Sequence, residues 1–475
     1  MIHIIGAGPA GISLAYYAVL AGYRDISIYE MTKNIGGMAR SWLHENFILD
    51  TGPHIFHTSD IEIENDWLEI GRDLLVKGQF NSCNILAEHE DKLFHYPISF
   101  ETLQENLTIR DFCKIKGEID FAKNNDNSGA TSSFKDFMQA KFGKTLTSMF
   151  FEKYPKKVWG LDTKNMLADW APQRIELREK NKPFYTKPFV AVGKKGTGCF
   201  YERIIQFLKK ESNFKLFLEH RLTGIQKNKN HIKNLIFNNT KIINLDNSDH
   251  IFSTIPASNL SELFGLKINL NYRGVKTEYF FFENKRVLPK NYNWVYCSDE
   301  KVAFNRITEP STMTKNVSPK GYTFVCVETT FPGGKIKDLN DDSDFLSWIK
   351  NRSNFDSSGI IPQLYTKNIE NYVYPIQDKN FRSALTRYNS LISNYKNLNV
   401  LGTGGEFHYS DMQIIFRKSK NMINSILSKK RESLNAIPLI KNINLNEKQN
   451  IDFNLEFEKQ NQKISYLEKI LLIMF

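Results

Sequence analysis

The sequence predicts an α/β protein in which one domain, built on a parallel sheet, is interrupted by two insertions. The chain opens with an apolar strand at residues 1–5, a glycine-rich turn, a helical stretch and a second strand at 25–30, which is a β-α-β order. Apolar spacing is then largely helical from about residue 61 to 180, and short strand-forming runs dominate between about 268 and 373. A chain of 475 residues is long enough for two or three subdomains.

Individual elements follow from the same periodicities. Amphipathic spacing predicts helices at 134–142 and 146–151. Strands are expected at 216–219, 231–237, 241–245, 250–255, 277–282, 294–297, 302–307, 322–328 and 399–401. The last of these is expected to return the chain to the first domain.

The turn after the first strand has the composition of a phosphate-binding loop. Gly6 allows a tight turn, Gly8 lets the backbone approach a pyrophosphate, and Gly11 permits close packing of the helix on the strand. The helix that begins near Ala10 offers free N–H groups and a positive dipole end to phosphate. Glu30, at the end of the second strand, is placed to accept hydrogen bonds from a ribose. These residues predict a Rossmann-type dinucleotide-binding domain.

A second glycine motif narrows the cofactor. The segment Gly36-Gly37-Met38-Ala39-Arg40 resembles the GGxxR segment that follows the first β-α-β unit in FAD proteins of the amine oxidase and glutathione reductase type. Arg40 can give charge-assisted hydrogen bonds to phosphate. We therefore expect FAD rather than NAD, with Gly37, Met38 and Arg40 among the residues that bind it.

The expected fold is thus a Rossmann-type FAD-binding domain with a helical insert and an antiparallel β-sheet insert. The expected boundaries are 1–60, 191–267 and 374–428 for the three parts of the FAD-binding domain, 61–190 for the mainly helical insert, 268–373 for the β-rich substrate domain, and 429–475 for a linker and C-terminal helix. In that helix Ile464, Leu467, Leu471 and Met474 have a coiled-coil a/d spacing, which fits a homo-oligomer contact or docking on the helix's own domain.

Composition restricts the function classes. The net charge is +11, but the lysines and arginines are spread through the chain and no nucleic-acid-binding signature accompanies them, so no nucleic-acid partner is expected. The five cysteines show no metal-type pairing, so no metal site is expected. No signal peptide or membrane-length apolar run is seen, so the expected location is the cytoplasm.

Further motifs resemble one flavoenzyme family, the UDP-galactopyranose mutases. The run from Asp50 to Thr58, DTGPHIFHT, is similar to the family's flavin loop G-x-H-I-F-H-T. Five later segments are similar to family motifs in the same order: DKLFHYP at 91–97, YPKKVWG at 154–160, NRITE at 305–309, YPI at 374–376 and FHYSDM at 407–412. Together the motifs extend from residue 2 to about 425.

The resemblance implies that reduced FAD acts as a nucleophile on the anomeric carbon of a nucleotide sugar, which recloses as a furanose. The substrate would be a nucleotide sugar, and an electron donor would be needed to reduce the flavin. In this family two arginines hold the diphosphate, here Arg174 and Arg306. The residues implied around the sugar phosphate are Tyr154, Trp159, Tyr185, Tyr374 and Tyr409. Those implied near the flavin are His54, Gly405, Asp411 and Met412.

Several departures leave alternatives open. Thr403 stands where the mutases carry an arginine, and Pro53 replaces a small residue. The segments 193–198 and 169–174 also look like a sister group, the FAD-dependent amine-oxidase-like oxidoreductases related to protoporphyrinogen oxidase. A third possibility is a flavin-bearing scaffold without catalysis, which the retained arginines and tyrosines disfavour. Two arginines in one pocket would favour the mutase, whereas an apolar pocket would favour the oxidoreductase.

Overall fold

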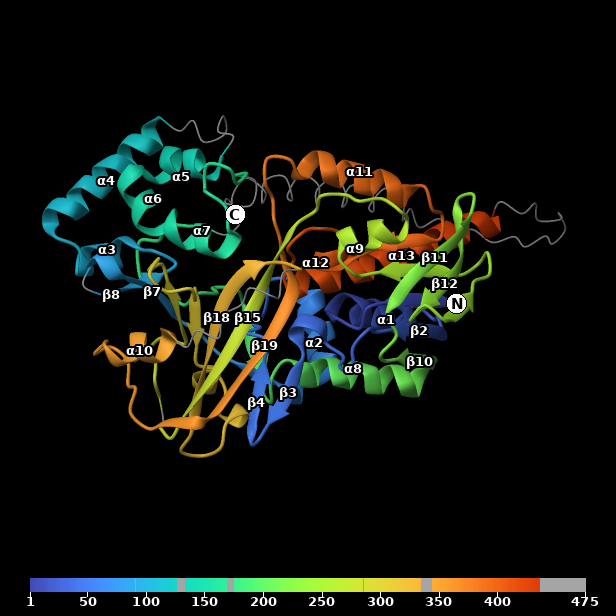
Figure 1. The fold of residues 1–475 in the computed structure, drawn as a ribbon, viewed down its shortest axis with the longest axis horizontal. Coiled ribbons are helices and arrows are strands. Elements are labelled where there is room, and N and C mark those ends of the chain that lie inside the picture. Colours follow the sequence, from blue (N-terminus) through green and yellow to red (C-terminus); the bar gives the residue numbers. More distant parts are fainter. Residues whose placement is uncertain (90, 126–132, 169–174, 285, 335–343, 436–475) are drawn as a thin grey trace, which may run out of the picture.

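The structure, a computed structural model, describes residues 1–435 except 90, 126–132, 169–174, 285 and 335–343 (Figure 1). Its first layer is a five-stranded parallel sheet in the order β10-β2-β1-β14-β20. The strands are β1 (Ile2–Ile5), β2 (Asp25–Tyr29), β10 (Asn213–Phe217), β14 (His250–Ser253) and β20 (Leu398–Val400). They come from three separate stretches of the chain, so the sheet forms only when distant segments meet. The α/β class with a Rossmann-like domain is confirmed.

Helices cover the parallel sheet because they carry apolar surface toward it. Helix α1 (Pro9–Leu20) has ten buried residues and packs between α8 (Gly198–Glu211) and α13 (Met412–Asn435). Burying apolar surface contributes roughly 25 cal/mol per Å² to folding, which makes this layer the main source of stability for the domain. On the opposite side lies a second core that includes α9 (Ala257–Leu263) and α11 (Phe381–Ser393).

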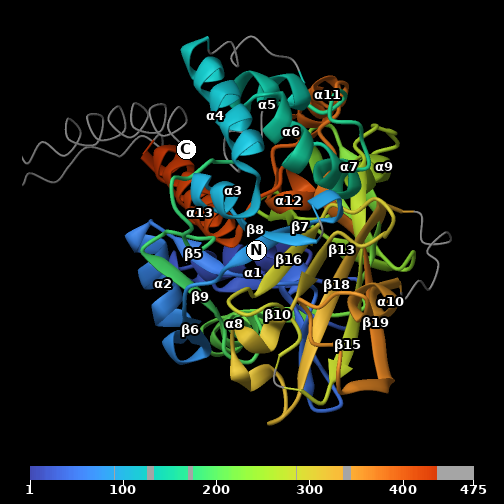
Figure 2. The ribbon, with the colours of Figure 1, turned by 90° about the vertical axis from the view of Figure 1, so that its left-hand side faces the viewer.

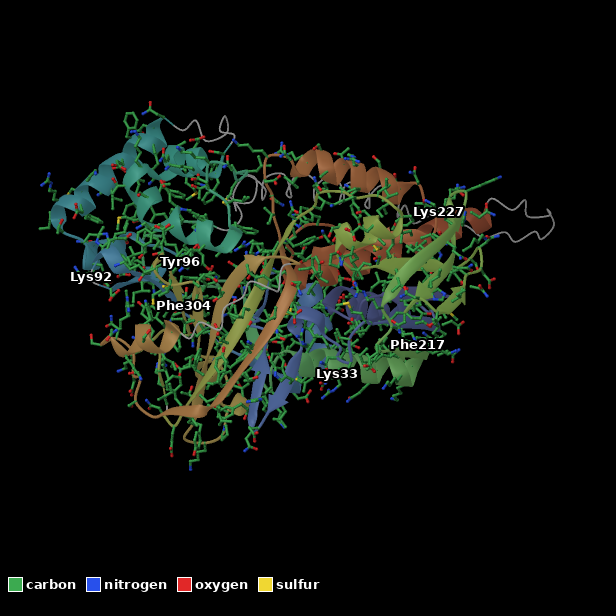
Figure 3. The ribbon with its side chains drawn as sticks, in the orientation of Figure 1. Lys33, Lys92, Tyr96, Phe217, Lys227 and Phe304 are labelled. Atoms are coloured by element: carbon green, nitrogen blue, oxygen red, sulfur yellow. The ribbon has the colours of Figure 1, made fainter. Side chains whose placement is uncertain are left out.

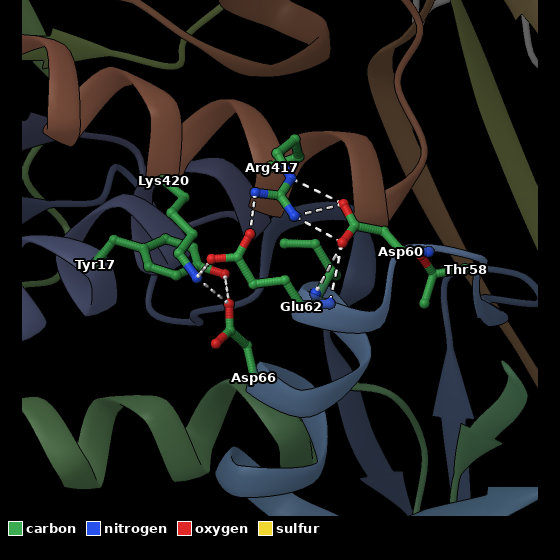
Figure 4. A network of polar contacts seen from close by, with 8 residues as sticks. Tyr17, Thr58, Asp60, Glu62, Asp66, Arg417 and Lys420 are labelled. Carbon is green, nitrogen blue, oxygen red and sulfur yellow. Dashed lines mark hydrogen bonds and ion pairs between the residues drawn. The ribbon is translucent and has the colours of Figure 1, made fainter. Parts of the chain in front are cut away.

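Polar contacts fix α13 against α2 (Ile61–Gly71), as Figure 4 shows. Asp60 caps the start of α2 by accepting hydrogen bonds from the backbone N–H groups of Glu62 and Ile63. The guanidinium of Arg417 donates to the same Asp60 carboxylate from Nε, at 2.8 Å, and from Nη2. A bidentate Arg–carboxylate pair has a defined geometry, so α13 is held in a fixed register beside β5 (Phe56–Thr58) and α2.

The second layer is a seven-stranded sheet in the order β19-β15-β18-β17-β16-β7-β8. Its strands are β7 (Ser82–Leu86), β8 (Lys92–Tyr96), β15 (Tyr272–Phe282), β16 (Trp294–Cys297), β17 (Arg306–Thr308), β18 (Thr323–Pro332) and β19 (Ile360–Pro375). All neighbours are antiparallel except β16 and β7, which run parallel. Two strands, β7 and β8, come from the segment that was expected to be mainly helical.

The remaining elements connect these layers. Helices α3 (Phe100–Asn106), α4 (Ile109–Asn124), α5 (Phe134–Phe142), α6 (Lys144–Phe150) and α7 (Lys153–Trp159) form one helical group over an end of the large sheet (Figures 1 and 2). Helix α10 (Asp344–Lys350) packs on the sheet, and α12 (Gly402–Gly405) precedes α13. Smaller sheets contain β3 (Ser41–His44) with β4 (Phe47–Asp50), β5 with β6 (Leu75–Lys77) and β9 (Phe189–Gly193), and β11 (Leu222–Asn228) with β12 (His231–Phe237) and β13 (Lys241–Asn244).

Some elements differ from the sequence-based expectations. The strand expected at 302–307 is shorter, since β17 begins only at Arg306 and residues 298–305 form the connection from β16. Residues 464–474, with their a/d spacing, lie outside the described residues. Within the part of the chain that the structure describes, every helix is too short or too polar to cross a membrane.

Candidate active site

The predicted phosphate turn has the backbone geometry that its glycines require. Gly6 has a φ of +106°, and a Cβ there would lie 2.2 Å from Oγ1 of Thr254. A Cβ on Gly11 would lie 2.1 Å from the carbonyl oxygen of Gly6, so α1 approaches β1 more closely than any side chain allows. A Cβ on Gly37 would come within 3.0 Å of the Cα of Gly8. The two glycine turns therefore face each other at the start of α1 with no side chain between them.

This arrangement fits an anionic group. The N-cap of α1 is Gly8, which has no side chain to bond the first N–H groups, and no acidic residue occupies the first turn. Such N–H groups are left for a ligand, and the helix dipole favours negative charge there. A dinucleotide pyrophosphate is a ligand of this kind, so the turn fits the cofactor expected from the sequence.

Glu30 lies at the end of β2, beside the same turn. One carboxylate oxygen accepts the backbone N–H of Ala7 at 2.9 Å, and the other accepts the N–H and the hydroxyl of Thr32, both at 2.9 Å. The residue is only 9% exposed. Because an ionised carboxylate offers about four acceptor positions, Glu30 keeps capacity for a ribose hydroxyl.

We predict that Glu30→Lys lowers cofactor retention by roughly tenfold or more, since the ammonium would meet the N–H of Ala7 donor to donor. The measurement is the ratio of bound dinucleotide to protein after extensive dialysis. The exposed Glu105→Lys in α3 is a matched charge-reversal control. Equal retention in the two variants would remove Glu30 from the cofactor site.

Arg40 has protein partners in the structure, whereas the sequence predicted a contact with phosphate. Its Nη1 donates to the carbonyl oxygen of Gly37 at 2.9 Å, while Nη2 donates to Asn368 at 2.8 Å and forms an ion pair with Glu370. The guanidinium thus joins the second glycine turn to β19. A contact from Arg40 to phosphate stays a prediction. Met38, in the same turn, accepts the hydroxyl of Thr51 at its carbonyl oxygen.

The predicted C-terminal cofactor residues come to the same edge of the parallel sheet. Gly402 has a φ of +82°, and a Cβ there would lie 2.7 Å from the Cβ of Ala10. A Cβ on Gly405 would lie 2.7 Å from the carbonyl oxygen of Ser253. Helix α12 therefore packs with its backbone against the start of α1 and the end of β14. Met412 then begins α13.

Asp411, just before α13, lies beside His57 on β5, with 3.7 Å between Oδ2 and Nε2. The ring of Tyr185 stacks on the His57 imidazole at a centroid distance of 4.0 Å. Tyr185 also belongs to an aromatic cluster that includes Tyr154 and Tyr296. The structure therefore places Tyr185 between the Asp411 side of the site and the tyrosines described below.

His54 lies on a loop between the two halves of the site. Its Nδ1 is 3.0 Å from the carbonyl oxygen of Gly52. Gly52 has a φ of +123°, and a Cβ there would lie 3.1 Å from Oε1 of Glu328. Burial lowers the pKa of His54 to about 4, and the charges of Arg306 and Arg40 act in the same direction. His54 is therefore neutral at physiological pH.

This lowered pKa has a consequence for stability. Between pH 6.5 and about 4 the unfolded chain binds a proton at His54 that the folded chain does not bind, so stability falls as pH falls through that window. We predict that the loss of unfolding free energy between pH 7 and pH 4.5 is smaller in His54→Gln than in the parent protein. Urea unfolding at the two pH values measures it. Equal losses of unfolding free energy in the two proteins would contradict the lowered pKa of His54.

Arg306 and Glu328 form the charged centre of the site. They are cross-strand neighbours on β17 and β18, and Nε and Nη2 of Arg306 donate to the Glu328 carboxylate at 2.8 and 2.7 Å. The Glu328 side chain is 3% exposed, whereas that of Arg306 is 21% exposed. Burial lowers the pKa of Arg306, but Glu328 more than offsets this, so the guanidinium stays charged.

Tyrosines and a tryptophan surround this ion pair. Tyr374 lies between Trp159 and Tyr409, with ring centroids 5.7 and 5.6 Å away. Tyr154 packs edge-on against Tyr296 at 5.1 Å, and Tyr296 is the cross-strand partner of Arg306. Burial raises the pKa of both Tyr154 and Tyr374, so their hydroxyls are neutral and can donate hydrogen bonds.

The structure therefore gathers Tyr154, Trp159, Tyr374 and Tyr409 about Arg306, although they come from three segments of the chain. Arg174 lies outside the described residues. The sequence reading did not include Tyr296, Glu328 or the side chain of His57. His57 was inside the DTGPHIFHT motif, and both Tyr296 and Glu328 were in expected strands, but no local pattern marked any of the three as a site residue.

Comparison with known proteins gives two family matches. Residues 4–69 match the model described as an NAD(P)-binding Rossmann-like domain. Residues 149–337 match the model described as UDP-galactopyranose mutase. The second range includes Tyr154, Trp159, Tyr185 and Arg306.

Relatives and solved structures extend over more of the chain. A probable UDP-galactopyranose mutase from Klebsiella pneumoniae is 21% identical over 90% of this chain and 94% of its own length. A dTDP-fucopyranose mutase from Escherichia coli is 23% identical over 67% of this chain and 78% of its own length. The crystal structure of a reduced UDP-galactopyranose mutase has a TM-score of 0.73 at 20% identity, covering 90% of this chain and 94% of that one. A candidate protoporphyrinogen oxidase from Exiguobacterium has a TM-score of 0.66 at 14% identity, covering 90% and 98%.

The fold and the glycine turns define a protein of the Rossmann-like class, in which a dinucleotide-binding domain carries a separate, larger sheet. Within that class the chain is similar to UDP-galactopyranose mutases, most clearly over residues 149–337, and the oxidoreductases share its fold at a lower similarity.

Proposed function

We propose that the chain is an FAD-dependent nucleotide-sugar mutase that interconverts pyranose and furanose forms, and that it acts with the flavin reduced. The observation that carries the proposal is the buried Arg306–Glu328 pair among tyrosine hydroxyls, next to the His54 loop. A charged guanidinium in such a place fits a phosphate-bearing substrate, whereas a cationic amine gives it no anionic partner.

Arg306 keeps one bonding edge for a phosphate. A guanidinium has five N–H donors, and Glu328 takes the Nε–H and one N–H of Nη2. The remaining edge, formed by Nη1 and Nη2, can still pair with two phosphate oxygens. Since Glu328 cancels the charge of Arg306, a diphosphate needs a second cation. We propose Arg174 for that role, which follows the family motif.

The other residues orient the sugar nucleotide. The hydroxyls of Tyr154, Tyr374 and Tyr409 would donate to phosphate and sugar oxygens, and Trp159 would form a wall of the pocket. These rings are half-buried in the structure, and a bound substrate would exclude water from between them, which would strengthen the charged hydrogen bonds inside. Reduced FAD, when bound, would supply a nucleophile for the anomeric carbon. The chain's part is to hold that carbon in place, and proximity of this kind lowers barriers by several kcal/mol, roughly 7–11 in the best cases.

The glycine turns, Glu30 and the GGMAR segment support FAD as the cofactor. The edge of the parallel sheet would hold its adenosine and pyrophosphate, and Gly405, Asp411 and Met412 would lie beside its ring system. The match to a Rossmann-like model described as NAD(P)-binding is compatible with this, because both cofactors carry the same ADP group.

Ligand titration tests the proposal. UDP and dTDP, the nucleotides in the names of the two mutase relatives, should bind the purified protein at micromolar to millimolar concentration. Putrescine and other amines should not bind. Binding of amines with no response to either nucleoside diphosphate would replace the mutase by the oxidoreductase alternative.

A further inference from the structure

Lys157 stands in the YPKKVWG segment, yet neither the cofactor nor the substrate proposal assigns it a part. It lies on α7 between Tyr154 and Trp159. Its ammonium donates to three backbone carbonyl oxygens, those of Asp299 and Phe304 at 2.7 Å and that of Cys297 at 3.2 Å. All three belong to the end of β16 or to the connection that follows it. Figure 3 labels Phe304 in this region, below the helical group.

The hydrogen-bond donors of Lys157 and the acceptors around it match in number. A lysine ammonium has three N–H donors and no acceptor, and three carbonyl oxygens receive them. The nitrogen also lies 5.9 Å from the centre of the Phe304 ring. Burial lowers the pKa of Lys157, and the carboxylates of Asp299 and Glu300 oppose that shift. A neutral amine would offer one donor fewer and direct a lone pair at a carbonyl oxygen.

The carbonyls that Lys157 holds are adjacent to the site residues. Cys297 follows Tyr296, and Phe304 is two residues before Arg306. The N–H of Cys297 donates to the carbonyl of Asn305 at 2.9 Å, which closes the base of the connection. Tyr296 and Arg306 are the last cross-strand pair before it. Lys157 therefore bridges the two sides of the β16–β17 connection and closes the hairpin that carries both residues.

The helix itself is fixed to the large sheet from the other side. Thr330 on β18 donates its hydroxyl to the carbonyl of Lys157 at 2.8 Å, and Nε of Arg273 on β15 donates to the carbonyl of Val158 at 3.2 Å. Arg273 is the cross-strand neighbour of Tyr374. A cation at the C-terminal end of a helix is favourable because the helix dipole is negative there.

We propose that Lys157 is a positioning residue for the nucleotide pocket: it fixes the β16–β17 connection, and with it Tyr296 and Arg306, to the helix that carries Tyr154 and Trp159. This inference rests on the proposed function, since it assumes that Arg306, Tyr154 and Trp159 bind a nucleotide sugar. Lys157 donates to backbone carbonyls and is not proposed as a ligand group.

The neighbouring lysine provides a matched control. Lys156 is 57% exposed and its Nζ lies 3.5 Å from Glu300 in the same connection. Lys156→Met and Lys157→Met thus remove the same charge from adjacent positions of one helix, and only the second removes the three carbonyl contacts. Lys157→Arg keeps the charge but replaces the ammonium by a planar fork that cannot meet three converging carbonyls.

The experiment measures amide hydrogen exchange of residues 298–306, UDP affinity, and KM and kcat of the flavin-loaded enzyme. We expect Lys157→Met to speed exchange in this segment by about tenfold or more, to weaken UDP binding roughly tenfold, and to raise KM more than it lowers kcat. Flavin content should be unchanged. Lys156→Met should stay within about twofold of the parent protein in each measurement. If Lys157→Met does not fold, Lys157→Arg takes its place. We then expect the same changes in exchange, UDP affinity and KM, each smaller in size.

The outcomes separate the two claims. Unchanged exchange in residues 298–306 overturns the role of Lys157 in closing the hairpin. Faster exchange with unchanged UDP affinity and KM overturns its positioning role and leaves a contribution to stability alone. If the parent protein binds no nucleoside diphosphate, the proposed function fails and the positioning role fails with it, while the exchange result still decides whether Lys157 closes the hairpin.

Discussion

Arg306→Ala is expected to lower turnover of a nucleotide sugar by about a hundredfold or more. Two hydrogen bonds from a charged group to phosphate would be lost, each worth about 1.5–3 kcal/mol, and the position of the anomeric carbon would be lost with them. The flavin content should be unchanged, because Arg306 lies on β17 of the large sheet and the glycine turns lie at the edge of the parallel sheet. Steady-state rates with the reduced enzyme, together with a UDP titration, measure the effect.

Alanine at this position also leaves Glu328 buried without its partner, which destabilises the fold by about 3–5 kcal/mol in comparable cases. The double variant Arg306→Met with Glu328→Gln removes both charges and keeps the volume, so it is the better test of binding. We expect it to fold, to hold flavin and to bind UDP at least tenfold more weakly than the parent protein. Unchanged UDP affinity in the double variant would show that the pair is structural only.

Gly8→Ala is expected to give a folded protein that holds little or no flavin. A Cβ on Gly8 has only the Cα of Gly37 near it, at 3.8 Å, which is an ordinary contact, so the polypeptide itself can accept the methyl group. The space beside that Cβ is where the two glycine turns face each other and where a pyrophosphate would approach the backbone. We expect cofactor affinity to fall by about a hundredfold or more, measured by flavin absorbance of the purified protein and by reconstitution with added FAD.

Two other glycine substitutions serve as controls for Gly8→Ala. Gly117 lies in α4 with open space around its Cβ position, so Gly117→Ala should retain flavin and gain slightly in stability, by about 0.5–1 kcal/mol. Gly11→Ala should instead damage the fold, because its Cβ would lie 2.1 Å from a backbone oxygen. A Gly8→Ala protein as yellow as the Gly117→Ala protein would show that the pyrophosphate does not lie at this turn.

The local parts of the fold and site could be predicted from the sequence because their causes are local. A glycine turn between an apolar strand and a helix is visible in ten residues, and helix α5 has the bounds that its periodicity predicted. The discontinuous sheet was also within reach, since its strands have strong apolar patterns. Strand β7 was missed because it lies within a largely helical segment and pairs with β16, more than two hundred residues away. Strand β8 pairs with β7 and falls in the DKLFHYP segment, which is similar to a strand motif of the mutase family.

The partners of the site residues could not be predicted, because pairing depends on register between distant strands. Glu328 neutralises Arg306 only because β17 and β18 align those two residues. Asp411 reaches His57 only because α13 packs beside β5, and Glu370 reaches Arg40 only because β19 lies beside the second glycine turn. The sequence thus indicated which residue types the site uses, whereas tertiary contacts determine which of their charges are already compensated.

The most direct test of the central claim is product analysis with UDP-galactopyranose and with dTDP-fucopyranose, using the same FAD-loaded protein in the oxidised and the dithionite-reduced state. We predict that the reduced protein converts at least one of them to its furanose form with no net oxidation of sugar or flavin, and that the oxidised protein does not. If neither state of the protein converts either sugar, and an amine or another hydride donor reduces the flavin, the proposed mutase activity is contradicted.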